Sequence, residues 1–206
     1  MCDALEVKDR RVTSLAQLVS SRICHDLISP VGAIHNGLEL LSLQGDLGAG
    51  EMVLIADSVA HAEARVRFFR LAYGSAGDGI VELTEIRSIL DTPVMGNPRL
   101  HVTWSGPAGA MRRDVQLAFL ALQCVEHAMP YGGTINISQD ANVWRVVGTA
   151  DRLKVEAALW AALETPSDTP NVTAAQVQFA LLPAILSDHG RALQVAVTDT
   201  MVSIAF

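Results

Sequence analysis

A heptad repeat of apolar residues near the N-terminus limits the folds open to this chain more than any other feature. From residue 27 onward the apolar positions alternate in steps of four and three: Leu27, Val31, Ile34, Leu38 and Leu41. Positions three and four apart share one side of a helix, so this spacing predicts an α-helix with one face committed to a core. Apolar residues before the repeat continue the stripe, and we expect one helix from about residue 8 to 44.

A second repeat of the same kind follows a glycine-rich segment at 44–50, which we interpret as a turn. Its apolar or small members are Met52, Ile55, Val59, Ala62, Val66 and Phe69. Two such helices joined by a short turn predict an antiparallel hairpin. A lone hairpin cannot cover both faces of its core, so the pattern favours dimerisation into a four-helix bundle. We expect the arginines near the end of the second helix to be solvated charges: Arg65, Arg67 and Arg70.

The pattern changes after a linker that contains Gly74, Gly77 and Gly79, so we divide the chain into a hairpin domain at 1–75 and a second domain at 80–206. Helices are expected in the second domain at 82–90, 113–128, 155–163 and 174–186. Strands are expected at 100–104, 134–138, 143–147, 193–197 and 201–205, the last four as two hairpins. Helices and antiparallel strands in mixed order predict a two-layer α/β sandwich, which makes the fold class α+β.

Composition excludes several classes of function. The net charge of −7 argues against a nucleic-acid surface, because phosphate binding needs clustered Lys and Arg. There is no run of about 20 apolar residues, and the N-terminus is charged where a signal peptide would be apolar. We therefore expect a cytoplasmic protein without a membrane span. The three cysteines lack CxxC spacing, so neither a disulfide framework nor a zinc cluster is indicated.

His25 and Asp26 stand at the start of the first repeat. His25 precedes Leu27 by two residues, so at about 100° per residue its side chain should point away from the apolar face and toward water. Pro30 lies within the same predicted helix, where it removes a backbone hydrogen bond and tends to bend the axis. The plain interpretation is a surface histidine beside a tolerated kink. The functional one is that the proline loosens the turn next to a reactive imidazole.

The order His-Asp-Leu-Ile-Ser-Pro-Val-Gly-Ala-Ile resembles the phosphoacceptor box of sensor histidine kinases, and His25, Asp26, Pro30 and Ile34 match it position by position. In that family the helix belongs to a hairpin that dimerises into a four-helix bundle, and the exposed histidine carries a phosphoryl group. The resemblance implies that His25 is the phosphoacceptor. Asp26 would orient one imidazole nitrogen or accept its proton while the other nitrogen attacks phosphorus.

The second domain resembles, in the order of its elements, the ATP-binding domain of the same kinases. Residues 120–133 align with the asparagine box, but Gln123 and His127 occupy the places where that family holds magnesium with asparagines. No Asp-x-Gly-x-Gly loop for adenine follows 143–147, and 164–173 contain no glycine-rich phosphate lid. Without these parts ATP binding loses its main sources of free energy. We therefore expect no bound nucleotide and no metal.

The whole chain resembles the ChpT-type histidine phosphotransferases, which pair such a hairpin with a degenerate ATPase-like domain. The resemblance implies a homodimeric phosphotransferase without kinase activity. It would accept a phosphoryl group on His25 from the receiver domain of a hybrid histidine kinase and pass it to the Asp of response regulators, with Mg²⁺ supplied by the receiver. Two alternatives stay open: an active ATP-dependent histidine kinase, and a non-catalytic dimeric scaffold for receiver domains.

Docking of a receiver domain needs a small apolar centre beside the reactive histidine, with polar groups around it. Ile28 and Gly32 follow His25 by one and two turns on its own side of the helix, and Gly32 allows close backbone approach. Arg22, one turn before His25, could neutralise phosphoryl charge; its plain interpretation is a solvated arginine. The candidate partner contacts are Arg22, Ile28, Ser29 and Gly32, with Pro30 as a structural residue near the site.

Overall fold

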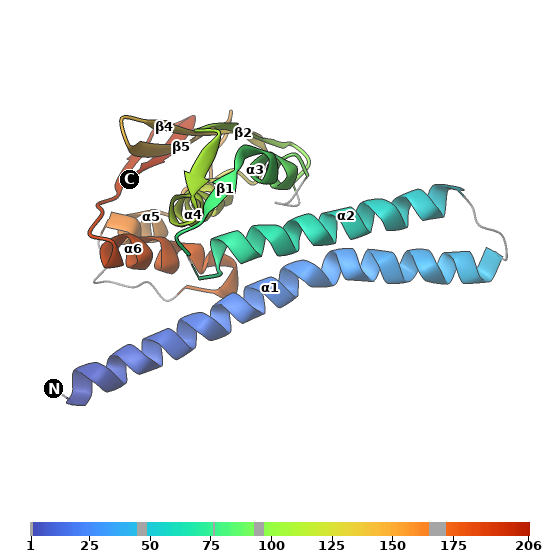
Figure 1. Ribbon diagram of the computed structural model, residues 1–206, viewed down its shortest axis with the longest axis horizontal. Coiled ribbons are helices and arrows are strands. Elements are labelled where there is room, and N and C mark those ends of the chain that lie inside the picture. The colour runs from blue at the N-terminus through green and yellow to red at the C-terminus, as the bar shows by residue number, and fades with distance from the viewer. Residues whose placement is uncertain (1, 45–48, 76, 93–96, 165–171) are drawn as a thin grey trace.

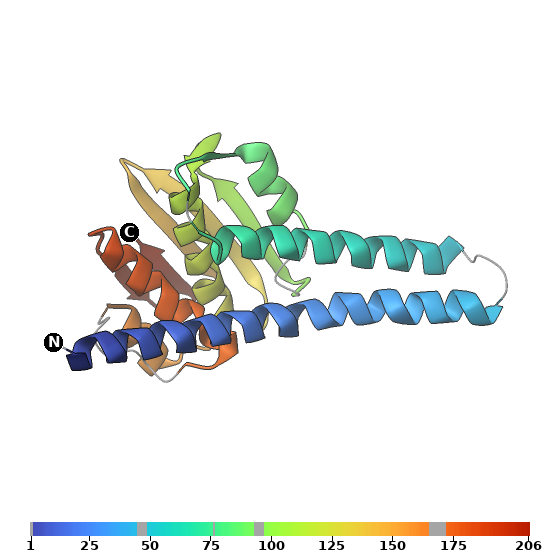
Figure 2. The same cartoon turned by 60° about the horizontal axis from the view of Figure 1, so that its bottom comes forward.

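Two long helices form the predicted hairpin in the computed structural model, which describes residues 2–44, 49–75, 77–92, 97–164 and 172–206. Helices α1 (Cys2–Gln44) and α2 (Ala49–Ala72) run antiparallel, and the N-terminal part of α1 continues beyond the end of α2 and past the second domain (Figures 1 and 2). The turn predicted at 44–50 falls on residues 45–48, which lie outside the described residues. No helix in the described part of the chain is long and apolar enough to cross a membrane.

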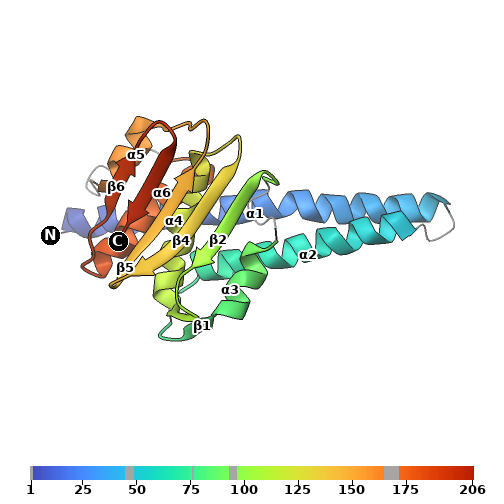
Figure 3. The ribbon, with the colours of Figure 1, turned by 90° about the horizontal axis from the view of Figure 1, so that it is seen from above.

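The second domain contains a mixed sheet with helices on one face. Its elements are β1 (Ile80–Glu82), α3 (Leu83–Leu90), β2 (Leu100–Ser105), β3 (Gly109–Met111), α4 (Arg112–His127), β4 (Gly133–Asp140), β5 (Val143–Thr149), α5 (Ala157–Glu164), the 3₁₀ turn η1 (Ala174–Gln176), α6 (Gln178–Asp188), β6 (Gln194–Val197) and β7 (Met201–Ala205). Within the described residues the sheet has the order β2-β4-β5-β7-β6, and β1 pairs separately with β3. Helices α4, α5 and α6 lie on the face of the sheet that looks toward the hairpin (Figure 3). The α+β fold class and the two-layer sandwich are confirmed.

Strand pairing confirms part of the sequence analysis and corrects the rest. The pairs β4–β5 and β6–β7 are antiparallel hairpins as predicted, and Ala141 and Asn142 make the tight turn of the first with φ of 45° and 68°. The expectation of antiparallel strands is wrong for β2, which lies parallel to β4 because α4 forms the crossover between them. Strands β1 and β3, of three residues each, were not predicted, since so short a run shows no alternation.

The core of the second domain is built around α4, where every residue from 115 to 125 is buried. Helix α2 packs against this helix: Phe68 stacks on Phe119 with ring centroids 4.8 Å apart. Both rings belong to one buried cluster that includes residues of the hairpin and of the sheet. Burying a side chain of this size contributes about 2 kcal/mol relative to exposure. The hairpin is therefore fixed to the second domain by shared apolar surface.

The heptad stripes are only partly covered within one chain. The half-buried members on α1 are Leu27, Ile34 and Leu41. Val31 and Leu38, however, are 56% and 53% exposed. On α2 the exposed members follow one another at seven-residue spacing: Met52, Val59 and Val66. Within a single chain, therefore, the predicted burial of each stripe is confirmed at every second position and is wrong at the positions between them.

Candidate functional site

His25 projects from the middle of α1 into solvent, and its side chain is 85% exposed. This confirms the exposure predicted from its place outside the apolar stripe. Its Nδ1 lies 3.0 Å from Oδ1 of Asp26, whose side chain is only 10% exposed. An ionised carboxylate can only accept hydrogen bonds, so Asp26 keeps the proton of the neutral imidazole on Nδ1. The lone pair is left on Nε2, the nitrogen suited to attack an electrophile.

Pro30 accounts for a hydrogen bond between the two helices. An ordinary residue at position 30 would donate its N–H to the backbone carbonyl of Asp26, four residues earlier, and proline has no N–H to donate. Arg65 of α2 donates from Nη1 to that same carbonyl oxygen at 3.1 Å. The expectation of a solvated Arg65 is wrong, because the side chain is half-buried over this contact. Burial lowers the pKa of Arg65, and the negative charge of Asp26 opposes this effect.

Arg22 connects Asp26 to the second domain. Its Nε lies 2.8 Å from Oδ2 of Asp26, and its Nη1 donates to the backbone carbonyl of Ala175 at 3.0 Å. The side chain is 18% exposed. The guanidinium is therefore held inside the protein, which corrects the plain interpretation of Arg22 as a solvated arginine.

Glu126, near the C-terminal end of α4, belongs to the same group of charges. Burial raises the pKa of Glu126 to about 7, while Arg22 and Arg65 lower it and Asp26 raises it further. Arg22 and Glu126 both line a cavity of about 290 Å³ between α1 and the second domain, together with His127, Pro130, Lys154, Glu156, Ala175 and Gln178. Two guanidinium groups and two carboxyl groups thus meet at the junction behind His25.

Apart from Arg22, the candidate partner contacts lie on the outward side of α1 around His25. Ile28 is 70% exposed, and Ser29 is exposed beside it. Gly32 is open on the outside, since a Cβ placed there would have no atom within 4 Å. The three positions follow His25 by three, four and seven residues, so they share its side of the helix. An apolar side chain, a hydroxyl and an open stretch of backbone therefore surround the imidazole.

The positions that align with magnesium ligands of histidine kinases make contacts within the chain. Gln123 is 1% exposed and accepts a hydrogen bond from the Tyr73 hydroxyl at 2.6 Å. Burial raises the pKa of Tyr73, so the hydroxyl keeps its proton and acts as the donor. His127 has Nε2 at 3.2 Å from Oε1 of Glu156 and meets the ring of Phe179 edge to face. In the described part of the chain no cluster of three or more His, Cys, Asp or Glu side chains could hold a metal ion.

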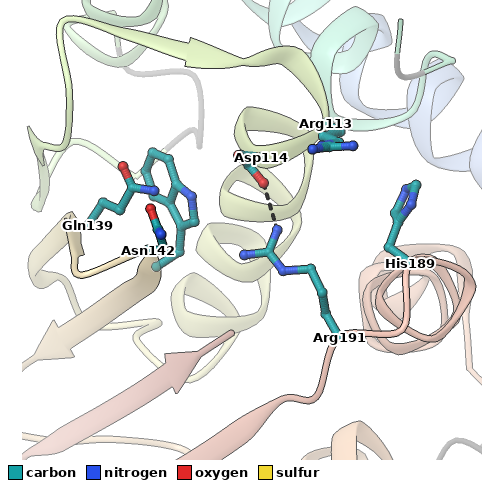
Figure 4. Close-up of a pocket in the computed structure, with 7 residues that line it drawn as sticks. Arg113, Asp114, Gln139, Asn142, His189 and Arg191 are labelled. Carbon is teal, nitrogen blue, oxygen red and sulfur yellow. Dashed lines mark hydrogen bonds and ion pairs between the residues drawn. The ribbon is translucent and has the colours of Figure 1, made fainter. Parts of the chain in front are cut away.

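A second cavity, of about 380 Å³, lies at the N-terminal end of α4, where Arg113 and Asp114 line it (Figure 4). It is lined by Arg113, Asp114, Gln139, Asn142, Trp144, His189 and Arg191. Arg191 and Asp114 form an ion pair at 2.6 Å, which neutralises part of its basic lining. No residue that we predicted for the site lies in this cavity.

The second domain matches a known protein family. Residues 83–201 match the family described as histidine phosphotransferase C-terminal domain. Over 125 residues the chain is 39% identical to the protein phosphotransferase ChpT of Brucella abortus (strain 2308). That alignment covers 60% of this chain and 59% of the relative, so the match spans about three fifths of the relative's length.

A solved structure resembles the full chain. The structure of a bacterial phosphotransferase superposes with a TM-score of 0.74 at 28% identity, covering 94% of this chain and 95% of that one. The histidine kinase AdeS of Acinetobacter baumannii reaches a TM-score of only 0.42 at 10% identity, with 88% of this chain covered. The first likeness includes the hairpin as well as the second domain, since so little of either chain is left out.

Proposed function

Because this chain belongs to the histidine phosphotransferase family, we propose that it carries phosphoryl groups from one protein to another on His25. The observation that carries the proposal is the geometry of His25 and Asp26. The imidazole is 85% exposed, and its Nδ1 is 3.0 Å from a carboxylate that is itself almost buried. The nucleophilic Nε2 is therefore accessible to a large partner, while Nδ1, which must keep its proton, is hydrogen-bonded to Asp26.

Phosphoryl transfer to His25 would take place in two steps. In the first, Nε2 attacks the phosphorus of an aspartyl phosphate, an N–P bond forms, and the bond to the aspartate oxygen breaks so that the carboxylate leaves. The positive charge that develops on the imidazole is stabilised by Asp26 through the Nδ1 proton. In the second step an acceptor aspartate attacks the same phosphorus and the imidazole leaves. Both steps depend on in-line positioning and neutralisation of charge.

The proposed donor is the receiver domain of a hybrid histidine kinase, and the proposed acceptors are response regulators. We propose that the receiver supplies Mg²⁺ and that this chain binds neither metal nor ATP. Two contacts support that view: Gln123 is engaged by Tyr73, and His127 by Glu156. The name of the relative from Brucella abortus, a protein phosphotransferase, agrees with a protein substrate. Because these partners are cytoplasmic signalling domains, we propose that the chain acts in the cytoplasm.

The exposed heptad positions support a homodimer. Gly37 of α1 and Ile55 of α2 lie against each other, and at 100° per residue the exposed heptad residues of each helix are rotated from that contact in the same sense. In antiparallel helices this places both sets on one face of the hairpin. They are Val31 and Leu38 on α1, and Met52, Val59 and Val66 on α2. A second copy that presents the same face would complete a four-helix bundle and cover these side chains.

The direct test follows a labelled phosphoryl group from a phosphorylated receiver domain. We expect the label to appear on the chain in an acid-labile form and to be absent from His25→Ala. The matched control is His35→Ala, because His35 is on the same helix, its side chain is 71% exposed, and its Nε2 lies 3.4 Å from Oε1 of Glu39. Transfer retained in His25→Ala would reject the assignment and favour the scaffold alternative.

The kinase alternative is separated by incubation with ATP and Mg²⁺ in the absence of any receiver. We expect no label on the chain, because the two positions that align with magnesium ligands are engaged within it, Gln123 by Tyr73 and His127 by Glu156. Label on His25 under these conditions would make the protein a histidine kinase.

A further inference from the structure

The guanidinium of Arg22 joins two parts of the chain that are far apart in sequence. Its Nε lies 2.8 Å from Oδ2 of Asp26, four residues further along α1. Its Nη1 donates to the backbone carbonyl of Ala175, 153 residues away in the second domain. The contact with Asp26 is an ion pair, whereas the contact with Ala175 is a hydrogen bond. Because a guanidinium is planar, the hydrogen bond to Ala175 restricts the plane of the fork and with it the place of the positive charge beside Asp26.

The carbonyl of Ala175 is itself held in place. Ala175 is the middle residue of η1, and this turn is closed by a capping box in which Thr173 and Gln176 satisfy each other. Gln176 also donates to Glu156 at 3.4 Å, and Val177 directly after the turn is fully buried. The second domain therefore presents a rigid acceptor to Arg22.

The two carboxylate oxygens of Asp26 have different partners. Oδ2 faces Arg22 at 2.8 Å, and Oδ1 faces Nδ1 of His25 at 3.0 Å. Rotation of the carboxylate would exchange or break both contacts, so Arg22 determines where Oδ1 lies. The position of Oδ1 in turn decides which imidazole nitrogen keeps the proton, because the hydrogen bond at one ring nitrogen fixes the tautomer.

We propose that Arg22 is a positioning residue through which the second domain holds His25 in the tautomer with the proton on Nδ1. The proposal rests on the proposed function, in which Nε2 is the attacking nitrogen. It gives the second domain a part in the transfer reaction that needs no nucleotide. It also separates two roles for Arg22, since a residue that holds Asp26 changes the reactivity of the imidazole, whereas a partner contact changes the affinity for the donor.

The test measures the tautomer directly, by ¹⁵N NMR of the His25 ring in the unphosphorylated full-length protein without partner. We expect predominantly Nδ1–H in the wild type and a lower fraction of this tautomer in Arg22→Ala. Arg22→Lys should be intermediate, because one ammonium group cannot reproduce the fork. Gln176→Ala, which removes the side-chain hydrogen bonds that close η1, should shift the tautomer in the same direction by a smaller amount.

Transfer from a phosphorylated receiver is measured on the same variants. We expect the rate at saturating receiver to fall roughly ten- to a hundred-fold in Arg22→Ala, as for a misplaced reacting group, with the half-saturating receiver concentration unchanged. The matched control is Arg67→Ala, because Arg67 is a half-buried arginine of the hairpin that bonds Ser88 at 3.4 Å instead. In Arg67→Ala the tautomer of His25 and the rate of transfer should equal those of the wild type.

Four outcomes overturn the proposal, and a fifth overturns the proposed function instead. An unchanged tautomer in Arg22→Ala removes the positioning role even if His25 still accepts phosphoryl groups. An equal shift of the His25 tautomer in Arg67→Ala assigns the effect to general loosening of the hairpin. An unchanged tautomer in Gln176→Ala means that the second domain does not help to position His25. A higher half-saturating concentration at an unchanged rate makes Arg22 a partner contact. Absence of any transfer to His25 would reject the proposed function, while the tautomer would still report on Arg22.

Discussion

Arg65 donates from Nη1 to the backbone carbonyl of Asp26 at 3.1 Å, the hydrogen bond that Pro30 is unable to make. The missing N–H belongs to α1, and the donor that replaces it comes from α2. The carbonyl of Asp26 therefore takes part in a hydrogen bond between the helices in place of one within α1. Asp26 is then held at its backbone by Arg65 and at its carboxylate by Arg22. Asp26 therefore has little conformational freedom.

Pro30→Ala should restore the intrahelical bond and make Arg65 less important. We expect the substitution to raise the free energy of unfolding by about 1 to 3 kcal/mol, since a proline inside a helix is costly. Arg65→Met should lower it by about 1 to 3 kcal/mol in the wild type, because a buried carbonyl loses its donor. The loss should be less than half as large in the Pro30→Ala background. Urea unfolding of the four proteins measures the coupling between the two positions.

The control for this cycle replaces Arg67, whose Nη1 bonds Ser88 at 3.4 Å and not α1. The effects of Arg67→Met and Pro30→Ala should add within about 0.5 kcal/mol. If Arg65→Met and Pro30→Ala also prove additive, the carbonyl of Asp26 does not link the two positions.

Gly37→Ala should destabilise the hairpin. A Cβ built on Gly37 would lie 2.6 Å from Cγ1 of Ile55, closer than two carbon atoms can approach, so α1 and α2 would have to move apart or Ile55 would have to change rotamer. We expect a loss of about 1 to 3 kcal/mol in thermal or urea unfolding, the usual cost of overpacking.

Gly32→Ala serves as the matched substitution, in the same helix and at a glycine with no atom within 4 Å of the new Cβ. Alanine is favoured over glycine within a helix, so this variant should gain about 0.5 to 1 kcal/mol. Equal effects of the two substitutions would mean that the helices are not in close contact at Gly37.

The pH dependence of stability should carry a contribution from Glu126. Burial raises its pKa from 4.5 to about 7, so between these values the folded protein keeps a proton that the unfolded chain has lost. Stability contributed by this group is therefore greatest below pH 4.5 and falls as the pH rises toward 7. Glu126→Gln stays neutral throughout. Relative to the wild type it should gain on the order of 3 kcal/mol in urea unfolding between the two ends of this window. A difference that stays constant with pH would place an ordinary carboxyl group at this position.

Local sequence patterns predicted the elements that repeat, and missed the contacts that join distant residues. Heptad spacing is a property of neighbouring positions, so it located α1, α2 and the exposed side of His25. Strands β1 and β3 are too short to alternate, and the parallel pairing of β2 with β4 depends on where α4 carries the chain. The bond from Arg22 to Ala175 spans 153 residues and leaves no periodic signal. Pro30 was the one visible sign of the bond to Arg65, since a proline in the interior of a helix leaves the carbonyl four residues earlier without its backbone donor.

Two glutamate substitutions, one beside His25 and one on the face assigned to the second copy, should separate docking from dimerisation. Ile28 is 70% exposed beside His25, whereas Val59 is 39% exposed on the face that we assign to the second copy. A charge buried in an apolar interface is unfavourable wherever that interface forms. Ile28→Glu should therefore slow transfer from a phosphorylated receiver at least ten-fold and leave the molecular mass in light scattering that of a dimer. Val59→Glu should lower the mass toward that of a monomer, while isolated monomers should still accept the phosphoryl group because His25 and Asp26 belong to one chain. Unchanged transfer in Ile28→Glu would remove Ile28 from the docking surface, and an intact dimer in Val59→Glu would remove Val59 from the interface between copies.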